Sequence, residues 1–218
     1  MAATRAPRRP ARPAPVPVGR GPRGPYTAGR QARQSITDAA WEVFAARGFR
    51  AGSVREIADR ARVSAANVIH HFGSKEALLV EVLRARDDRT GRPVLEQARC
   101  GDLLPALRAL VRANAADPNL TRLFATAAAD AADPAHPAHR YFQERYATVR
   151  SWISLGIERA RATGSLPQGP DADLVATTMV AVLDGLQTQW LLDPDLDMPA
   201  AFDAHLLSLG AVLEETTP

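Results

Sequence analysis

The stretch SVREIADRARVSAANVIHHFGSKEALL, residues 53–79, contains three successive signals for the start of a helix. Ser53 is followed three residues later by Glu56, the capping-box pair with which many helices begin. Ser64 and Ser74 each precede another short run with helical apolar spacing, and a serine in that position accepts a backbone N–H at the helix start. We therefore expect three short helices joined by tight links.

A further helix is predicted before this stretch, from about Arg30. Its apolar residues recur at spacings of three and four: Ile36, Ala40, Val43 and Phe44. Gly48 then suits the left-handed residue that ends a helix. Two helices joined by a turn of about four residues, packed against a third, form the helix-turn-helix geometry of DNA-binding proteins.

The helix expected over residues 65–72 would present its outer face to the major groove, where base edges differ. Two small alanines at its start suit a close approach to DNA, and an asparagine and two histidines supply hydrogen-bonding groups. Backbone N–H groups at the helix starts favour phosphate. The candidates for contact with bases or phosphates are Ser53, Ser64, Ala65, Ala66, Asn67, His70, His71 and Lys75.

Charge is divided unevenly along the chain. Residues 1–75 carry 14 basic and 4 acidic side chains, whereas residues 76–218 carry 13 basic and 20 acidic ones. This balance of +10 followed by −7 indicates that the first third faces a polyanion. Residues 1–26 are rich in arginine and proline and predict a disordered arm. That arm either adds DNA contacts or is a solvated tail or the product of a start codon placed too far upstream.

The rest of the chain predicts helices and no strand, so the expected fold class is all-α. The helical runs cover residues 103–116, 119–132, 138–163 and 171–192, and a last helix carries Phe202, Leu206, Leu209 and Leu213. The run from Leu174 to Leu192 is apolar nearly all round, with Asp184 among its few polar interruptions. Such a helix should be buried on more than one side.

Other classes of function find little support. No apolar run is long enough to span a membrane, and no secretory signal is present, so we expect a cytoplasmic protein. The single cysteine, Cys100, cannot form an internal disulfide. His70 and His71 point about 100° apart on a helix and are poorly placed to share a metal ion. Because no phosphate loop, nucleophile elbow or catalytic carboxylate pair stands out, we expect no enzyme activity, cofactor or metal.

Three runs together resemble the signature of the TetR family of bacterial transcriptional regulators: SVREIA at residues 53–58, RVS at 62–64 and VIHHFGSKEAL at 68–78. With the preceding helix and Gly48–Phe49, the resemblance extends over about fifty residues. The run LDGLQTQWLLDP at residues 183–194 is more loosely similar to the regulatory domains of the family. One position departs from the pattern, because Ile69 stands where the family usually has tyrosine.

The resemblance implies a DNA-binding domain over residues 27–73 and a ligand-binding and dimerisation domain over residues 74–218, with roughly nine helices. The last two helices would pack against those of a second copy. Base contacts are implied for Arg55, Ala65, Ala66, Asn67 and Ile69, and phosphate contacts for Ser53, His70, His71 and Lys75. Without the usual hydroxyl, Ile69 would touch a thymine methyl group or simply pack.

The leading hypothesis is a homodimeric repressor that leaves a palindromic DNA operator when a small molecule binds its second domain. The candidates for the lining of that ligand cavity are Leu83, Leu107, Val111, Phe124, Tyr146, Trp152, Met179 and Leu183. The helix that starts after Ser74 would couple the cavity to the DNA. An activator, a DNA binder without sequence preference, and a helical ligand carrier or enzyme remain as alternatives. The sequence identifies neither the effector nor the operator.

Overall fold

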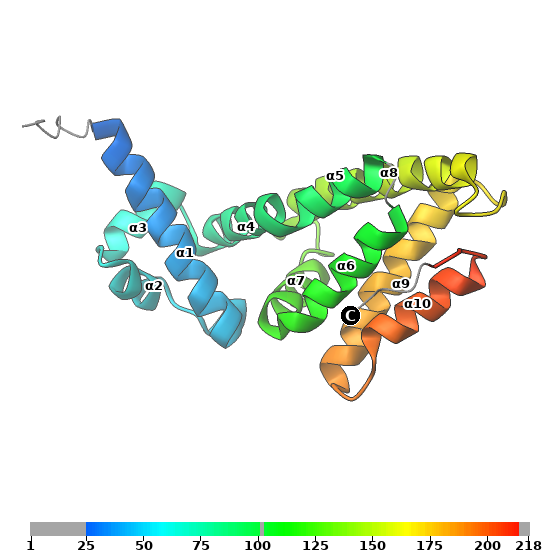
Figure 1. Cartoon of the computed structure of the whole chain (residues 1–218). Coiled ribbons are helices and arrows are strands. Elements are labelled where there is room, and N and C mark those ends of the chain that lie inside the picture. Colours follow the sequence, from blue (N-terminus) through cyan, green and yellow to red (C-terminus); the bar gives the residue numbers. More distant parts are fainter. Residues whose placement is uncertain (1–24, 101–102, 214–218) are drawn as a thin grey trace, which may run out of the picture.

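The computed structural model describes residues 25–100 and 103–213, which form helices and no strands (Figure 1). The helices are α1 (Pro25–Ala51), α2 (Val54–Ala61), α3 (Ala65–Phe72), α4 (Lys75–Arg86), α5 (Arg92–Cys100), α6 (Leu103–Ala116), α7 (Pro118–Asp130), α8 (His139–Thr163), α9 (Ala172–Leu192) and α10 (Met198–Ser208). A π-helical turn, η1 (Asp87–Gly91), connects α4 to α5. The expected all-α fold class is confirmed.

Serine caps begin three helices where the sequence predicts them. The side chains of Ser53, Ser64 and Ser74 each accept a hydrogen bond of 3.1 Å from the backbone N–H three residues later. The first helix begins at Pro25, earlier than expected, because proline is well suited to the first position of a helix. The predicted arm of residues 1–26 therefore lies almost wholly outside the described residues.

Helices α1, α2 and α3 form a small head, whose apolar core is part of a larger cluster shared with α4, α7 and α8. Its fully buried side chains are Ile36, Ala40, Val43, Phe44, Ile57, Ala58 and Val68. The turn between α2 and α3 passes through Arg62, whose φ of 58° is in the left-handed region. The N–H of Val63 then donates to the carbonyl of Ala58 over 2.9 Å. This tight turn fixes α3 across α2 and leaves the outer side of α3 uncovered.

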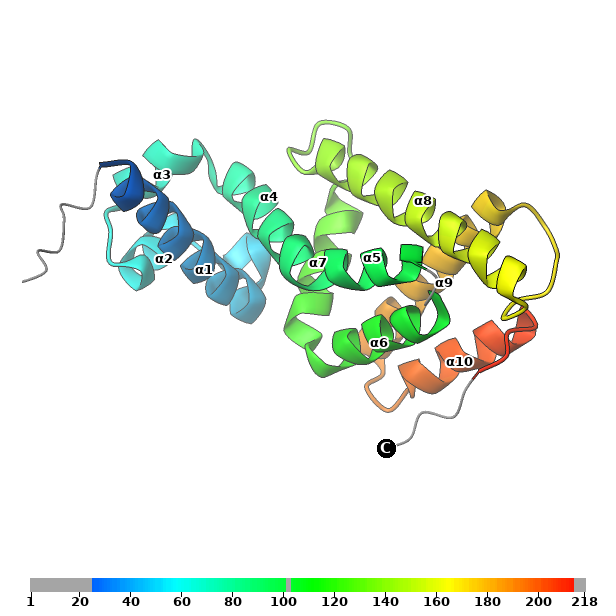
Figure 2. The ribbon, with the colours of Figure 1, turned by 45° about the horizontal axis from the view of Figure 1, so that its top comes forward.

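One continuous helical rod, formed by α4, η1 and α5, runs from the head into the rest of the molecule and bends between α4 and α5 (Figures 1 and 2). The wider turn η1 ends two residues before Pro93, which has no N–H to donate and whose ring crowds the preceding turn. A π turn relieves that crowding without ending the rod. Because the rod contains two α-helical segments, the described residues contain ten α-helices instead of about nine.

Helices α5, α6, α8, α9 and α10 enclose the larger core of the molecule, as Figure 2 shows. Its fully buried members include Leu107, Ile153, Ile157, Met179 and Phe202. The last helix ends at Ser208, shorter than predicted, because Gly210 has a φ of 78°. Leu209 and Leu213 therefore lie beyond α10 and not within it. In the single chain α9 packs against α7, α8 and α10 and is exposed along one side.

The head is fastened to the rest of the molecule by α4 and also by α7. Leu123 and Ala127 of α7 belong to the same apolar cluster as the buried residues of α1 and α4. The guanidinium of Arg50 in α1 lies 2.9 Å from the carboxylate of Asp130 at the end of α7. One apolar cluster therefore crosses the predicted boundary at residue 73.

None of the described helices combines the length and the apolar character needed to span a membrane.

Candidate nucleic-acid interface and internal cavity

The outer side of α3 carries a small group of exposed side chains at helical spacing. Ala66, Ile69 and His70 are exposed, whereas Val68 faces the head core and is fully buried. Residues at spacings of three and four share one face of a helix. Ile69 is 42% exposed, which is unusual for a large apolar side chain in a small domain. The face is therefore shaped for contact with another surface.

The other predicted DNA contacts lie around this face at different depths. Ser53, Arg55 and Ser64 are exposed, whereas Ala65, Asn67, His71 and Lys75 are half-buried. The carbonyl oxygen Oδ1 of Asn67 is buried without a hydrogen-bond partner. The predicted set therefore gathers on and beside α3, but not all of its members point outward.

Arg33 of α1 holds the end of α3 in place. Its guanidinium donates a hydrogen bond of 2.9 Å to the carbonyl of His71 and lies 4.5 Å from the ring centroid of Phe72. The same guanidinium pairs with Glu81 of α4 at 2.9 Å. Arg33 thus connects α1, α3 and α4, and fixes the orientation of α3 relative to the other two helices.

Lys75, the only lysine of the chain, lies at the first residue of α4. Its ammonium donates to the carbonyl of Arg50 at 3.3 Å and lies 4.6 Å from the ring centroid of Phe49. These contacts hold the positive charge at the start of a helix, where an anion is favoured by the backbone N–H groups.

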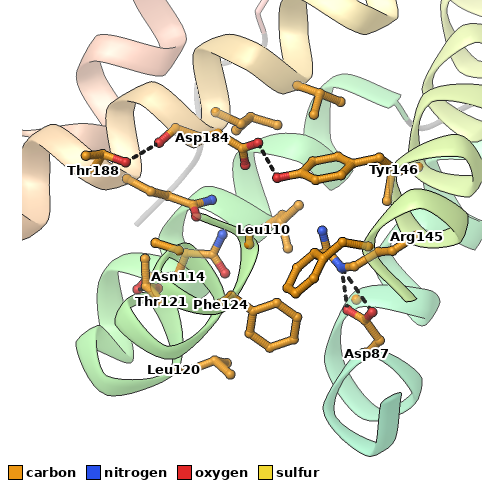
Figure 3. Close-up of a pocket in the computed structure, with 18 residues that line it drawn as sticks. Asp87, Leu110, Asn114, Leu120, Thr121, Phe124, Arg145, Tyr146, Asp184 and Thr188 are labelled. Atoms are coloured by element: carbon orange, nitrogen blue, oxygen red, sulfur yellow. Dashed lines mark hydrogen bonds and ion pairs between the residues drawn. The ribbon is translucent and has the colours of Figure 1, made fainter. Parts of the chain in front are cut away.

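A cavity of about 150 Å³ lies between α6, α7, α8 and α9, beside η1 (Figure 3). Its apolar lining consists of Leu110, Leu120, Phe124, Ala125, Ala128, Phe142, Val149, Val180 and Leu183. Polar lining is provided by Asn114, Thr121, Gln187 and Thr188, and the charged members are Asp87, Arg145 and Asp184. A mainly apolar space with a few polar groups is typical of small-molecule sites.

The charged groups on one side of the cavity are mutually satisfied. The guanidinium Nε of Arg145 lies 3.0 and 3.1 Å from the two carboxylate oxygens of Asp87, and the hydroxyl of Tyr141 donates to the same carboxylate. Arg145 also lies over the ring of Phe124, 5.1 Å from its centroid. Asp87 belongs to the π turn, so this ion pair fixes the middle of the rod to α8.

At another part of the cavity wall, Asp184 of α9 faces Tyr146 of α8 (Figure 3). The hydroxyl of Tyr146 donates to Oδ2 of Asp184 over 2.7 Å. Burial raises the pKa of the Asp184 carboxyl above its ordinary value, and the hydrogen bond from Tyr146 and the charge of Arg145 offset this only in part. Burial, together with the hydrogen bond to Asp184, also raises the pKa of Tyr146.

The predicted cavity lining is only partly brought together. Phe124, Tyr146 and Leu183 line the cavity. Trp152 lines a second hollow, of about 260 Å³, which shares Asp87, Arg145 and Val149 with the first. The other predicted residues, Leu83, Leu107, Val111 and Met179, are buried in the two apolar cores.

The polar and charged lining was not predicted from the sequence. Asp184 nevertheless carries a signal, because an acidic residue in the middle of an otherwise apolar helix is costly unless it has a partner or a role. The signals for Asp87 and Arg145 are weaker, since nothing in the sequence brings residues 58 positions apart into contact.

Metal-ligating side chains are not grouped. In residues 25–100 and 103–213, no three His, Cys, Asp or Glu side chains lie together where they could hold a metal ion. His70 and His71 form an edge-to-face ring contact with centroids 5.6 Å apart. Cys100 is exposed at the end of α5.

Two family models match this chain. One describes bacterial regulatory proteins of the tetR family and matches residues 36–82, and the other describes the C-terminal part of BetI-type transcriptional repressors and matches residues 102–211. The second match alone covers half of the chain. The chain belongs to the TetR family. The first match covers the helix-turn-helix together with most of α4, and the second covers the helices that surround the cavity.

Individual TetR-family relatives agree with this assignment. The HTH-type transcriptional repressor KstR2 of Rhodococcus jostii is 43% identical over 68 residues, which are 30% of this chain and 33% of KstR2. The match thus spans about a third of the length of that relative. A transcriptional regulator from Rhodococcus sp. RHA1 has a similar crystal structure, with 26% identity and a TM-score of 0.68 over 85% of this chain and 99% of that one. The SmeT–triclosan complex shares the fold, with 19% identity and a TM-score of 0.64 over 86% and 97% of the two chains.

Proposed function

We propose that this TetR-family protein is a homodimeric transcriptional repressor that binds a palindromic DNA operator and releases it when a small molecule enters the cavity between α6 and α9. The observation that carries the proposal is the exposed face of α3, with Ala66, Ile69 and His70 held outward by a capped and well-packed head. The relative KstR2 is itself named a transcriptional repressor. We expect the protein to act in the cytoplasm, on chromosomal DNA.

Direct reading of bases by α3 follows from its size and surroundings. A helix fits the major groove of B-DNA, and residues on its outer face reach the base edges. Ala66 allows the backbone to approach closely, Ile69 can contact a thymine methyl group, and His70 can donate or accept a hydrogen bond. The excess of basic residues in the first third of the chain supplies the attraction to phosphate.

A second copy of this chain is the partner that fits the exposed side of α9. Leu174 and Leu192 are 59% and 83% exposed, and their separation of 18 residues is about five helical turns, which places them on the same side. Between them on that side lie only uncharged residues: Thr177, Thr178, Ala181, Gly185 and Thr188. Leu207 of α10 adds another exposed apolar side chain, 57% exposed. This uncharged surface, here called the α9 face, supports dimerisation through the last two helices.

A twofold dimer explains why the operator should be palindromic. Two heads related by twofold symmetry read two inverted half-sites, whose spacing must match the distance between the α3 helices. A ligand that is bound better with the heads at another separation lowers DNA affinity, because only a difference in affinity between two states can shift an equilibrium.

Helix α7 and the rod provide the physical link between cavity and head. Leu120 and Phe124 of α7 line the cavity, while Leu123 and Ala127 of the same helix pack into the cluster that contains the head core. Asp87 connects the cavity to the rod that continues α4. An occupant that moves α7 or Arg145 therefore moves the elements on which the head rests.

Selection from random duplex DNA by the purified full-length chain at moderate salt tests the proposal. Enrichment of a palindrome with two half-sites is the expected result. Salt-sensitive binding without enrichment would replace the regulator with a DNA binder that lacks sequence preference. The absence of any DNA binding would overturn the proposal and leave the helical body as a ligand carrier or an enzyme.

A further inference from the structure

The two carboxylates that line the cavity differ in how they are satisfied. Asp87 is paired with Arg145 and also receives the hydroxyl of Tyr141. Asp184 forms no ion pair with any described residue and receives one side-chain hydrogen bond, from Tyr146. With all three charged groups ionised, the cavity holds two negative charges and one positive charge. The unbalanced charge is located at Asp184.

An ionised carboxylate without a cation is unfavourable in such a place. Asp184 is half-buried within the apolar part of α9, between Leu183 and Gly185. Burial raises the pKa of its carboxyl, and the hydrogen bond from Tyr146 and the charge of Arg145, which is already paired with Asp87, offset this only in part. A ligand that carries a positive charge would provide that compensation at the cavity wall.

The other groups near Asp184 are suited to a cation with N–H donors. The Tyr146 hydroxyl uses its proton on Asp184, so its oxygen remains as an acceptor. Gln187 and Asn114, whose side-chain amides can accept hydrogen bonds, line the same cavity. The aromatic rings of Phe124 and Phe142 offer faces that attract positive charge.

An anionic ligand would meet the opposite situation. Arg145 is the only cationic side chain among the lining residues, and both oxygens of Asp87 already lie within 3.1 Å of its Nε. An anion would have to displace Asp87 from the π turn while also facing the carboxylate of Asp184. The cavity therefore selects against carboxylates and phosphates.

We infer that the cavity binds a small organic cation, an ammonium group carried on an apolar body about the size of one aromatic ring, with the ammonium against Asp184. A cavity of about 150 Å³ lined by apolar side chains is large enough for benzene, which sets the size of that body. The inference deepens the proposed function, on which it rests only for the statement that the ligand is an effector.

Three probes of nearly equal size test the charge preference: benzylammonium, benzyl alcohol and benzoate. Titration calorimetry on the full chain without DNA should show benzylammonium binding at least ten times more tightly than benzyl alcohol, with benzoate weaker still. Equal or tighter binding of benzyl alcohol or benzoate would overturn the inference. So would the absence of benzylammonium binding at millimolar concentration.

Two matched variants test whether the charge of Asp184 causes the preference for benzylammonium. Asp184→Asn preserves shape and can still accept the Tyr146 hydrogen bond, and it should abolish the preference for benzylammonium over benzyl alcohol. Asp173→Asn removes the same charge from the exposed start of the same helix, away from the cavity, and should leave the preference unchanged. Equal effects of the two variants would mean that only net charge matters and would overturn the role of Asp184.

Tyr146→Phe keeps the test decisive if Asp184→Asn does not fold. This variant keeps the Asp184 carboxylate but removes its hydrogen-bond donor and one acceptor for the ammonium, so the preference for the cation should fall without being lost. A fall of that preference to about one would contradict the inference.

The outcome of the DNA selection does not depend on the outcome of the ligand titrations. Cation preference without any DNA binding would leave the ligand class in place and overturn the regulator. Operator binding without cation preference would leave the regulator in place and overturn the ligand class.

Discussion

Gly156 of α8 lies directly against Ala98 of α5: a Cβ atom built on Gly156 would be 2.8 Å from the Ala98 carbonyl oxygen. It would also be 2.9 Å from Cδ1 of Leu103 in α6. Real Cβ atoms do not approach a backbone carbonyl so closely. The absence of a side chain at residue 156 therefore allows the rod and α8 to pack together.

Gly156→Ala should lower the free energy of unfolding by about 1–3 kcal/mol, the usual cost of overpacking a core, even though alanine is the better helix former. Urea unfolding monitored by circular dichroism measures this change. Gly29→Ala in α1 is the matched control, because nothing lies within 4 Å of a Cβ built there. A parent-like midpoint for Gly156→Ala would contradict the close packing.

Lys75→Ala should weaken binding to all DNA sequences alike and make binding less dependent on salt. Each phosphate contact contributes about one unit to the slope of log K against log salt, so the loss of one contact per head reduces the slope by about two per dimer. Titration of a labelled duplex at several salt concentrations provides the slope. Lys75→Arg should retain it. If the alanine variant kept the parent slope, Lys75 would have no phosphate contact.

Asn67→Ala should change which bases are preferred, by about 1–3 kcal/mol at one position of each half-site. The expected cost to folding is small, because the buried Oδ1 of Asn67 has no hydrogen-bond partner to lose. Selected-sequence profiles and thermal unfolding of the same preparation measure the two effects. An unchanged profile would remove Asn67 from the residues that read bases.

Ala181→Glu should dissociate the dimer. Ala181 is exposed in the middle of the α9 face, so glutamate there is harmless to a single chain but places two carboxylates close together across a twofold interface. A rise of about a hundredfold in the dissociation constant, about 3 kcal/mol, is expected. Sedimentation velocity measures the populations of monomer and dimer. Ala147→Glu, at an exposed position of α8, is the control, and equal dissociation of both variants would remove α9 from the interface.

Asp184→Asn should raise the unfolding temperature by a few degrees at neutral pH. Burial makes the pKa of Asp184 higher in the folded chain than in the unfolded one, so the ionised carboxylate disfavours folding above the folded-state pKa. The difference between variant and parent should shrink as the pH falls through that pKa and vanish below the ordinary value of 3.8. Scanning calorimetry across this range checks the trend. A variant that is less stable than the parent at pH 7 would contradict it.

The head could be predicted almost residue by residue because its signals are local. Each serine cap acts within three residues, and the alternation of buried and exposed positions on α3 follows from helical spacing alone. Interactions between residues so close in the sequence can be predicted without knowledge of the tertiary structure.

The cavity could be predicted only in part because its wall is assembled from distant residues. Leu107 and Met179 have the same apolar character and helical spacing as Leu183, yet they are buried in the core while Leu183 borders the cavity. Which apolar side chain faces the hollow depends on the crossing of helices. The pairing of Asp87 with Arg145 likewise depends on the π turn, which local sequence signals did not predict.

The adjacency of Leu123 and Phe124 on α7 has a consequence for redesigning the ligand response. One of these neighbours packs into the cluster that contains the head core, and the other lines the cavity. Changes on α7 that retune ligand choice will therefore also alter resting operator occupancy, so a biosensor evolved through this helix would gain new responses together with leaky expression. Val180 and Gln187 of α9 line the same cavity but lie outside that cluster, which makes them the positions at which a mutant library can change specificity while leaving the background signal low.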